Sequence, residues 1–163
     1  TSDQNRWTTS GRSIYVNFGD INMWGFQVEA AFRPSENVTF TANYTYNDGE
    51  NKSDQRGRDK VVGIYKHKIG LGAKWYIPEI GLRLDGRAYY VGNSYSQLPT
   101  FSNPNQAEET TGSYFIAGLT ATKYLFDDHL EIYAAVDNIF DEDYGNNYPG
   151  RGRSFILGTR ISF

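Results

Sequence analysis

Apolar and polar residues alternate one by one along most of this 163-residue chain. Between Trp24 and Phe32, for example, every second residue is apolar and the residues between are mostly small or polar. Side chains of a β-strand point to opposite faces in turn, so a strand with one apolar and one polar environment has this period of two. The pattern predicts an all-β chain whose strands each have one apolar face.

The alternation falls into three hairpins followed by a single last strand. We expect strands at 14–32 and 38–46, at 67–76 and 82–90, at 114–125 and 129–138, and at 154–163. The hairpin turns are expected at 33–37, 77–80 and 126–128. Pro34 and Asn37 suit the first of these turns, because both residue types are common where a chain reverses direction.

The connections between strands alternate in length. The three hairpin turns are short, whereas the segments 47–66, 93–113 and 139–152 are long loops. Structureless loops of this length are uncommon in a compact soluble domain. Outer-membrane barrels have short turns on the periplasmic side and long loops outside, so the alternation favours a transmembrane antiparallel β-barrel.

Aromatic residues lie where the two edges of a membrane would be. Trp24 and Phe32 flank one apolar stripe, and Phe155 and Phe163 flank the last one. At about 3.3 Å per residue and a tilt near 40°, the stretch from Trp24 to Phe32 rises about 22 Å, close to the apolar band of an outer-membrane barrel. The alternative is a soluble barrel or sandwich whose apolar faces point inward.

A helical membrane protein is excluded by the distribution of apolar residues. The longest apolar run, Ile132 to Val136, is far shorter than the roughly 20 residues that a membrane-spanning helix needs. Aromatic residues make up 16% of the chain and there are 17 glycines, a mixture that favours strands and tight turns.

The number of strands decides whether the sheet can close. If 14–32 is one strand, the chain has seven strands, and an odd antiparallel sheet cannot close on itself because its first and last strands run parallel. We therefore expect a fragment of a larger barrel, or one piece of a barrel made from several chains. A turn at 19–22 would give eight strands, which could close alone.

Several classes of chemistry have no support in the sequence. The chain has no cysteine and a net charge of −3, without a dense basic cluster, so we expect neither thiolate metal sites nor nucleic-acid binding. His67 and His129 are far apart, and the acidic residues of 47–66 alternate with lysine and arginine, as in a solvated loop. No catalytic motif is present, and we expect no enzyme activity, no cofactor and no metal site.

The end of the chain resembles the C-terminus of TonB-dependent outer-membrane receptors. The similar residues are Val136-Asp137-Asn138-Ile139-Phe140-Asp141-Glu142-Asp143-Tyr144, then Tyr148-Pro149-Gly150-Arg151-Gly152-Arg153-Ser154-Phe155, and the terminal Phe163. Further similarities are Asn17-Phe18-Gly19, Gly25, Glu29, Pro34 and Tyr44-Thr45-Tyr46-Asn47-Asp48. The resemblance extends over almost the whole chain.

This resemblance implies that residues 1–163 are the C-terminal segment of a barrel of roughly 22 strands, located in the outer membrane of a Gram-negative bacterium. In the family a plug domain, absent from this chain, fills the barrel. An energy-coupling protein of the TonB type then drives import of a ferric siderophore, cobalamin or a similar scarce ligand. The expected partners are outer-membrane lipid, the other strands and plug of the receptor, that coupling protein and the barrel-assembly machinery.

Two other functions are compatible with the sequence. One is a small outer-membrane anchor or assembly protein whose barrel closes by itself or with a partner chain, and whose loops bind another protein. The other is a passive porin, which is the weaker hypothesis because the Asn-Ile-Phe-Asp and Tyr-Pro-Gly segments are not typical of porins.

Candidate ligand contacts lie in the long loops, which alone reach the outside. An anionic, aromatic ferric siderophore would suit the stacking and cationic side chains of Tyr95, Phe101, Tyr148, Arg151 and Arg153. Charged and polar side chains on the strands are expected to face the lumen, namely Arg83, Asp85, Arg87, Glu131, Tyr133 and Asp137. These can contact the plug or line the ligand path, or they can form ion pairs that stiffen the wall.

The last strand has an expected role in assembly. Its outward apolar residues end in a terminal aromatic, as in the signal that the barrel-assembly machinery reads in this family. The residues of this predicted signal are Phe155, Leu157, Ile161 and Phe163. A lipid-facing strand would alternate in the same way without any such signal, so both explanations can hold.

Overall fold

A computed structural model describes residues 21–52, 60–97, 105, 107–144 and 150–163. Seven strands form one antiparallel sheet in the order β1-β2-β3-β4-β7-β8-β9. Their bounds are β1 Ile21–Ser35, β2 Val38–Asn51, β3 His67–Ile77, β4 Leu82–Val91, β7 Tyr114–Leu125, β8 Leu130–Asp137 and β9 Ser154–Ile161. The predicted all-β antiparallel architecture with seven main strands is confirmed.

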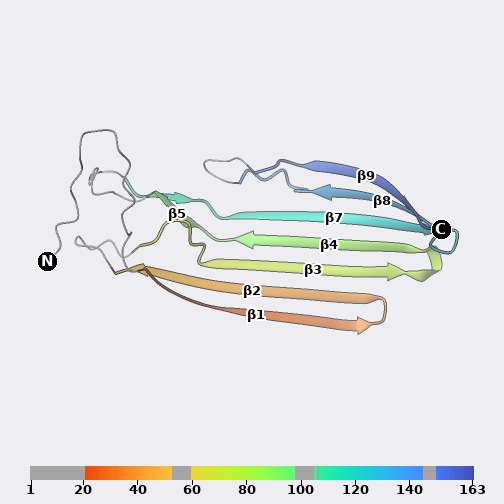
Figure 1. The fold of residues 1–163 in the computed structure, drawn as a ribbon, viewed down its shortest axis with the longest axis horizontal. Coiled ribbons are helices and arrows are strands. Elements are labelled where there is room, and N and C mark those ends of the chain that lie inside the picture. Colours follow the sequence, from red (N-terminus) through yellow and green to blue (C-terminus); the bar gives the residue numbers. More distant parts are fainter. Residues whose placement is uncertain (1–20, 53–59, 98–104, 106, 145–149) are drawn as a thin grey trace.

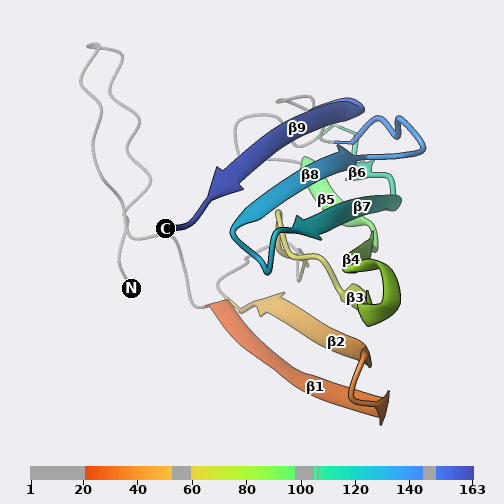
Figure 2. The same cartoon turned by 90° about the vertical axis from the view of Figure 1, so that its right-hand side faces the viewer.

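The sheet is an open arc of long strands. Viewed along the strands, it curves from β1 at one edge to β9 at the other (Figure 2). The hairpin turns lie together at one end of the strands, and the described parts of the long connections lie at the opposite end (Figure 1). Within the described ranges, no helix has the length and apolar character needed to cross a membrane.

The register of the strands gathers the alternating residues onto two faces. Val28 of β1 pairs with Tyr44 of β2, which pairs with Ile69 of β3, and such rows continue across the sheet. One face, called here the apolar face, has these residues: Trp24, Phe26, Val28, Phe32, Phe40, Ile69, Leu71, Trp75, Leu82, Leu84, Leu119, Ile132, Leu157 and Ile161. The opposite, polar face has the charged residues of β4, β8 and β9.

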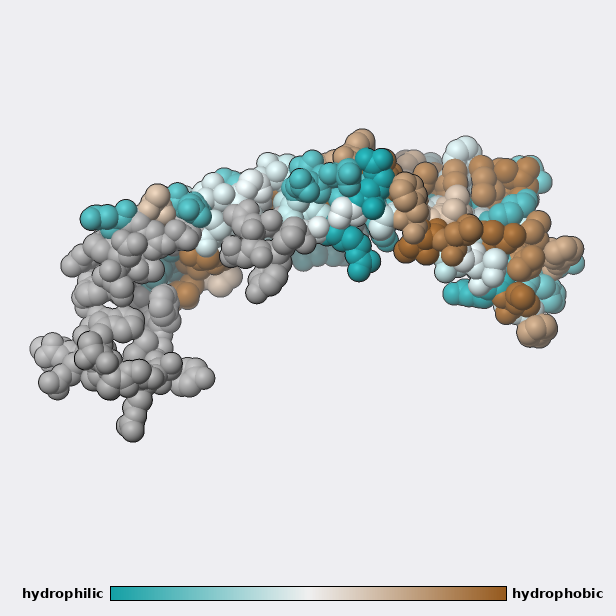
Figure 3. Space-filling model, turned by 90° about the horizontal axis from the view of Figure 1, so that it is seen from above, coloured by the Kyte–Doolittle hydropathy of each residue, from teal (hydrophilic) through white to brown (hydrophobic). Residues whose placement is uncertain are grey.

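The apolar side chains are not buried within the chain. Among the described residues no hydrophobic side chain is buried, and Leu157 and Phe155 keep 79% and 76% of their surface exposed. Brown side chains gather over the end of the sheet with the hairpin turns, and teal ones over the part toward the long connections (Figure 3). A sheet that buries no apolar side chain of its own needs an apolar environment outside it.

Two of the hairpin turns owe their geometry to particular residues. After the 3₁₀ turn η1, Pro78–Ile80, the chain reverses at Gly81, whose φ of 55° suits glycine. Phe126, Asp127 and Asp128 all have positive φ, which closes the third turn. Lys123 lies on the apolar face beside this end, and its ammonium group donates a hydrogen bond to the carbonyl of Ile80.

The first turn is shorter than the sequence suggested. We predicted a turn over 33–37, but β1 continues to Ser35, which pairs with Val38. The register shifts between Phe32 and Ser35, so Arg33 and Pro34 form a bulge within the strand. Proline has no N–H to donate to the ladder, and a bulge accommodates it without breaking the hairpin.

Two predicted loops contain additional strands. β2 extends to Asn51 and pairs there with β1, so residues 47–51 are strand and not loop. The segment 93–113 contains a small hairpin of β5, Ser94–Gln97, and β6, Glu109–Thr111. Residues 14–20 of the predicted first strand lie outside the described residues, but Ile21 and Asn22 belong to β1 and not to a turn at 19–22.

Candidate functional site

Ion pairs cross the polar face of the sheet. Arg83 and Asp85, two residues apart on β4, have their side chains 2.8 Å apart. Arg160 of β9 lies 3.6 Å from Glu131 of β8. The Arg83 guanidinium also lies over the ring of Tyr124, 5.7 Å from its centre. The Arg160–Glu131 pair and the Arg83–Tyr124 contact join adjacent strands, as the wall-stiffening role requires, whereas the Arg83–Asp85 pair lies within one strand.

A third ion pair spans three strands. Arg87 of β4 donates a hydrogen bond to Asp137 of β8, although β7 lies between these strands. Gly118 of β7 pairs with Arg87, and a Cβ added at Gly118 would lie 2.9 Å from Oδ1 of Asp137. The missing side chain of Gly118 leaves room for the contact.

The register places all six predicted lumen-facing residues on the polar face. Arg83, Asp85 and Arg87 share it on β4, and Glu131, Tyr133 and Asp137 share it on β8. The ring of Tyr133 extends across β9, where a Cβ on Gly158 would lie 2.4 Å from its hydroxyl oxygen. That this face lines a lumen stays a prediction.

At the end of the sheet with the long connections, residues 60–66 contact the β5–β6 hairpin through side-chain and backbone interactions. The ammonium of Lys60 lies 2.7 Å from the Glu108 carboxylate and 4.8 Å from the centre of the Tyr95 ring. The N–H of Gly63 donates to the carbonyl of Tyr95 at 2.9 Å, and Val62 forms a β-bridge with Tyr95. The hydrogen bond to Glu108 raises the pKa of Lys60.

A groove of about 580 Å³ lies beside this contact, between the end of β2 and the small hairpin. Asp48 and Lys66 line it and approach to 3.0 Å. The hydrogen bond from Lys66 lowers the pKa of Asp48, and the same contact raises the pKa of Lys66. Both lysines of the groove, Lys60 and Lys66, are thus paired with carboxylates.

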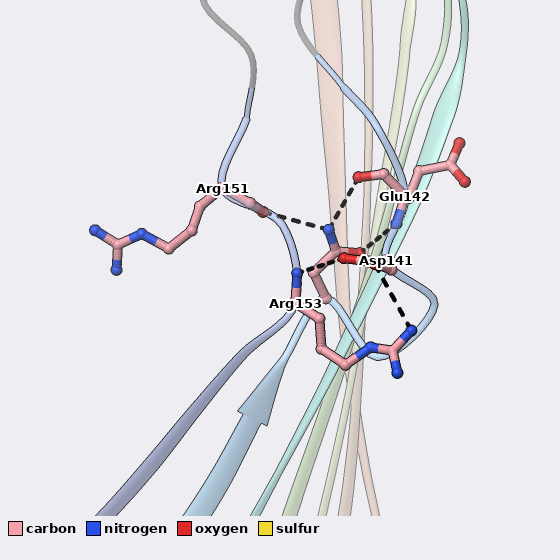
Figure 4. A network of polar contacts seen from close by, with 5 residues as sticks. Asp141, Glu142, Arg151 and Arg153 are labelled. Carbon is pink, nitrogen blue, oxygen red and sulfur yellow. Dashed lines mark hydrogen bonds and ion pairs between the residues drawn. The ribbon is translucent and has the colours of Figure 1, made fainter.

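The connection between β8 and β9 is organised around Asn138 (Figure 4). This side chain has only 2% of its surface exposed, and its backbone φ is 51°. Its Oδ1 accepts from the N–H of Glu142 at 2.9 Å, while Nδ2 donates to the carbonyls of Glu142 at 2.9 Å and Arg151 at 3.3 Å. One buried amide therefore ties both limbs of the connection together.

Asp141 adds a second link within the same connection. Its Oδ1 accepts from the backbone N–H of Arg153 at 2.7 Å, and its Oδ2 lies 4.0 Å from the Arg153 guanidinium. Asp141 also has a positive φ of 55°. Ile139 joins the group to β7 through its N–H, which donates to the carbonyl of Ala117.

The three predicted ligand contacts that the structure describes, Tyr95, Arg151 and Arg153, do not contact one another. Phe101 and Tyr148 lie outside the described residues. Tyr95 lies in β5 under Lys60, whereas Arg151 and Arg153 precede β9. Within the described part of the chain, no contact joins Tyr95 to either arginine. Their role in binding a ligand stays a prediction.

The predicted assembly residues lie on one side of the last strand. Phe155, Leu157 and Ile161 belong to the apolar face of β9, in register with Val136, Ala134 and Leu130 of β8. Phe163 follows the strand and is fully exposed. The pairing of the chain end continues at Ser162, whose N–H donates to the carbonyl of His129. A role as an assembly signal stays a prediction.

Two organising residues were missed from the sequence. Asn138 belongs to the Asn-Ile-Phe-Asp segment, but we assigned it no role, although an asparagine directly after a strand is a common left-handed residue. Lys60 is one of the lysines and arginines that alternate with acidic residues in 47–66, a pattern typical of a solvated loop. Its partner Glu108 is distant in sequence, so no local pattern could identify the pair.

Comparison with known proteins decides the family. Residues 1–139 match the family described as TonB dependent receptor-like, beta-barrel. The chain belongs to this family. As a TonB-dependent receptor barrel segment, it falls in a group of receptors and transporters, which confirms that it is not an enzyme.

Two of the relatives of this TonB-dependent receptor segment have names that place them in the outer membrane. It is 26% identical, over its full length, to 24% of the iron-regulated outer membrane virulence protein of Vibrio cholerae. Its fold matches the ferripyoverdine receptor of the outer membrane of Pseudomonas aeruginosa bound to ferripyoverdine, with a TM-score of 0.72 and 21% identity, over 88% of this chain and 20% of that one. It also matches the copper transporter OprC, with a TM-score of 0.70 and 18% identity, over 89% and 24% of the two chains.

These findings confirm the predicted family and the outer-membrane location of its members in Gram-negative bacteria. The family takes up iron, siderophores or other metals, which confirms the expected function at that level. The chain spans about a quarter of the length of the curated relatives it matches, 24% in each case.

Proposed function

We propose that residues 1–163 form the C-terminal part of the barrel of an outer-membrane receptor that imports a ferric siderophore. The observation that carries this proposal is the two-faced open sheet, whose apolar face has no covering within the described residues and whose long connections gather at one end. In this arrangement lipid covers the apolar face, the polar face lines the interior, and the loops at one end receive the ligand.

In the complete receptor, this segment has several further partners. The edges β1 and β9 pair with the remaining strands of the barrel, and a plug fills its interior. An energy-coupling protein of the TonB type acts through that plug, and the barrel-assembly machinery inserts the whole. The support is the family match together with the share of each relative that this chain covers.

A ferric siderophore is the proposed ligand because two relatives have names that concern iron. The Vibrio cholerae relative is iron-regulated, and the Pseudomonas aeruginosa receptor binds ferripyoverdine. A copper transporter has the same fold, so the fold alone admits other metals. The exposed guanidinium of Arg151, before β9, favours an anionic complex over a free metal cation.

The rival proposal is a small self-contained barrel that anchors or assembles other proteins. It requires β1 and β9 to pair with each other or with a partner chain. In the described residues each of these strands pairs on one side only. The rival therefore needs an additional pairing, whereas a larger receptor supplies both missing neighbours.

The test is uptake of iron by cells that produce the complete receptor containing this segment. Cells with the receptor should take up an iron-55 siderophore complex, and an uncoupler of the proton gradient should abolish uptake while leaving binding. Cells that lack the receptor provide the baseline. Equal uptake with and without the receptor, or uptake that the uncoupler leaves unchanged, would contradict energy-coupled import.

A further inference from the structure

Two arginines precede the last strand, and the structure treats them differently. Arg151 and Arg153 belong to a Gly-Arg-Gly-Arg stretch that leads into β9. By sequence they are equivalent, because both are cationic residues of the same connection. Their contacts separate them, and the separation indicates which one is available to a ligand.

Arg153 is used within the protein. Its backbone N–H donates to Asp141, and its guanidinium lies 4.0 Å from the other oxygen of the same carboxylate. The positive charge of Arg153 therefore has a negative neighbour before any ligand arrives. An anion that approached Arg153 would compete with Asp141 and would be repelled by it.

Arg151 is held by its backbone alone. Its carbonyl accepts a hydrogen bond from Nδ2 of Asn138, while its exposed side chain points away from the network (Figure 4). Among the described residues, no carboxylate pairs with this guanidinium. The fixed backbone limits where the charge can be, which lowers the entropy lost when an anion binds.

Asn138 supplies this fixed backbone. It is almost fully buried, and its three hydrogen bonds join the limb that follows β8 to the limb that precedes β9. A buried amide with all of these partners is costly to disrupt, because each lost bond leaves a polar group unpaired. The position of Arg151 is thereby coupled to a rigid point at the end of β8.

We propose that Arg151 is the charge-selecting contact of the receptor for anionic ferric complexes, and that Asn138 is the positioning residue that presents it. Arg153, paired with Asp141, serves the structure of the loop and not the ligand. This inference rests on the proposed function as an iron-siderophore receptor. A guanidinium suits the task because it can donate two parallel hydrogen bonds to one carboxylate or catecholate group.

The experiment compares two probes on the complete receptor in outer-membrane vesicles, an anionic ferric tricatecholate and an uncharged ferric trihydroxamate. Arg151→Gln should weaken binding of the anionic probe about tenfold, the effect of losing one charge-assisted hydrogen bond, and leave the uncharged probe unchanged. The matched control, Arg153→Gln, should not alter the ratio of the two affinities. If the parent receptor binds only the anionic probe, the affinities of Arg151→Gln and Arg153→Gln for that probe are compared instead.

A second variant tests the positioning role. Asn138→Gly permits the left-handed backbone but removes the amide, so it should lower the affinity for the anionic probe in the same direction as Arg151→Gln. Combining the two substitutions should then add little, since both act on one contact. Additive losses would show that Asn138 acts independently of Arg151 and would overturn its positioning role.

The outcomes separate the inference from the proposed function. Equal effects of Arg151→Gln and Arg153→Gln, or no effect of Arg151→Gln on an anionic probe that does bind, would overturn the inference alone. A receptor that binds only the uncharged probe would also overturn it. Binding of neither probe would overturn the proposed ligand class and the inference with it.

Discussion

Arg87 of β4 pairs with Asp137 of β8 across the backbone of β7, at the position where β7 has Gly118. The contact joins strands that are not neighbours in the sheet. Both side chains remain partly exposed, at 54% for Arg87 and 36% for Asp137, so the pair itself contributes little to stability. Its dependence on a glycine makes the arrangement testable.

Replacing Gly118 with valine should destabilise the barrel by about 1 to 3 kcal/mol, because the new side chain meets the ion pair and overfills this part of the polar face. The matched control is Gly112→Val, since a Cβ at Gly112 would have no neighbour within 4 Å. The free energy of unfolding is measured by urea titration of the complete receptor in detergent. Equal destabilisation by the two substitutions would contradict the role of Gly118.

The two faces of the sheet should react with different reagents. Single cysteines at Trp24, Phe26, Leu82, Leu84, Ile132, Leu157 and Ile161 should react with a lipid-soluble maleimide and resist a water-soluble one. Cysteines at Arg83, Asp85, Arg87, Glu131, Tyr133 and Asp137 should react with the water-soluble reagent, unless a plug covers them. The comparison is between intact cells that produce the receptor with its plug domain and cells that produce it without that domain. Similar labelling of the two sets would contradict a lipid face and a lumen face.

The strands were predictable because the alternation of residues is long and regular. The predicted strand 114–125 coincides with β7, and both faces of β9 are those expected from Phe155, Leu157 and Ile161. We did not predict from the sequence which residues pair across neighbouring strands. The alternation nevertheless restricts this register, because apolar residues on adjacent strands can share a face only in certain pairings. The bulge at Pro34 was not predicted because the segment Pro34-Ser35-Glu36-Asn37 also suits a turn.

The candidate site was less predictable than the strands. The β5–β6 hairpin is short and polar, so its sequence shows no apolar alternation. The contact of Lys60 with Tyr95 and Glu108 joins segments distant in the chain. Arg151 and Arg153 differ because Asp141 pairs with Arg153 and not with Arg151. The sequence does not indicate which of the two arginines pairs with Asp141, since they are the same residue type in one motif.

Removing the terminal aromatic should impair assembly. Phe163→Asp replaces a fully exposed aromatic side chain with a charge at the expected membrane boundary, and should reduce the amount of folded receptor in the outer membrane. Ser162→Ala should have little effect, because Ser162 pairs through its backbone N–H, which alanine retains. The folded fraction is read from heat-modifiable mobility on gels. Equal yields for Phe163→Asp and the parent would count against the assembly role.

The contact between Asp48 and Lys66 should depend on pH in a defined direction. The pKa of Asp48 lies below its ordinary 3.8, so this contact stabilises the fold above that value and is lost as the pH falls through the lowered pKa. The pKa of Lys66 lies above its ordinary 10.5, so its contribution is fully present below that value and is lost as the pH rises through the raised pKa.

An NMR titration of the Asp48 carboxyl carbon measures this coupling. Lys66→Gln should raise the pKa of Asp48 toward 3.8, because the charged donor is removed. Lys68→Gln is the matched control, since the ammonium of Lys68 lies over the ring of Tyr65 and not beside Asp48. An unchanged pKa in Lys66→Gln would show that the contact does not form in solution.

We propose that this sheet is one part of a larger barrel and cannot close by itself. Among the described residues no strand pairs with the outer edge of β1 or of β9, and hydrocarbon leaves unpaired N–H and C=O groups unsatisfied at a cost of several kcal/mol each. The most direct measurement is the heat-modifiable gel mobility of residues 1–163 produced alone, and produced together with the upstream part of the receptor. We expect no heat-resistant folded band from the chain alone and a folded receptor band when both parts are present. A heat-resistant folded monomer from the chain alone would contradict the claim and favour the self-contained barrel.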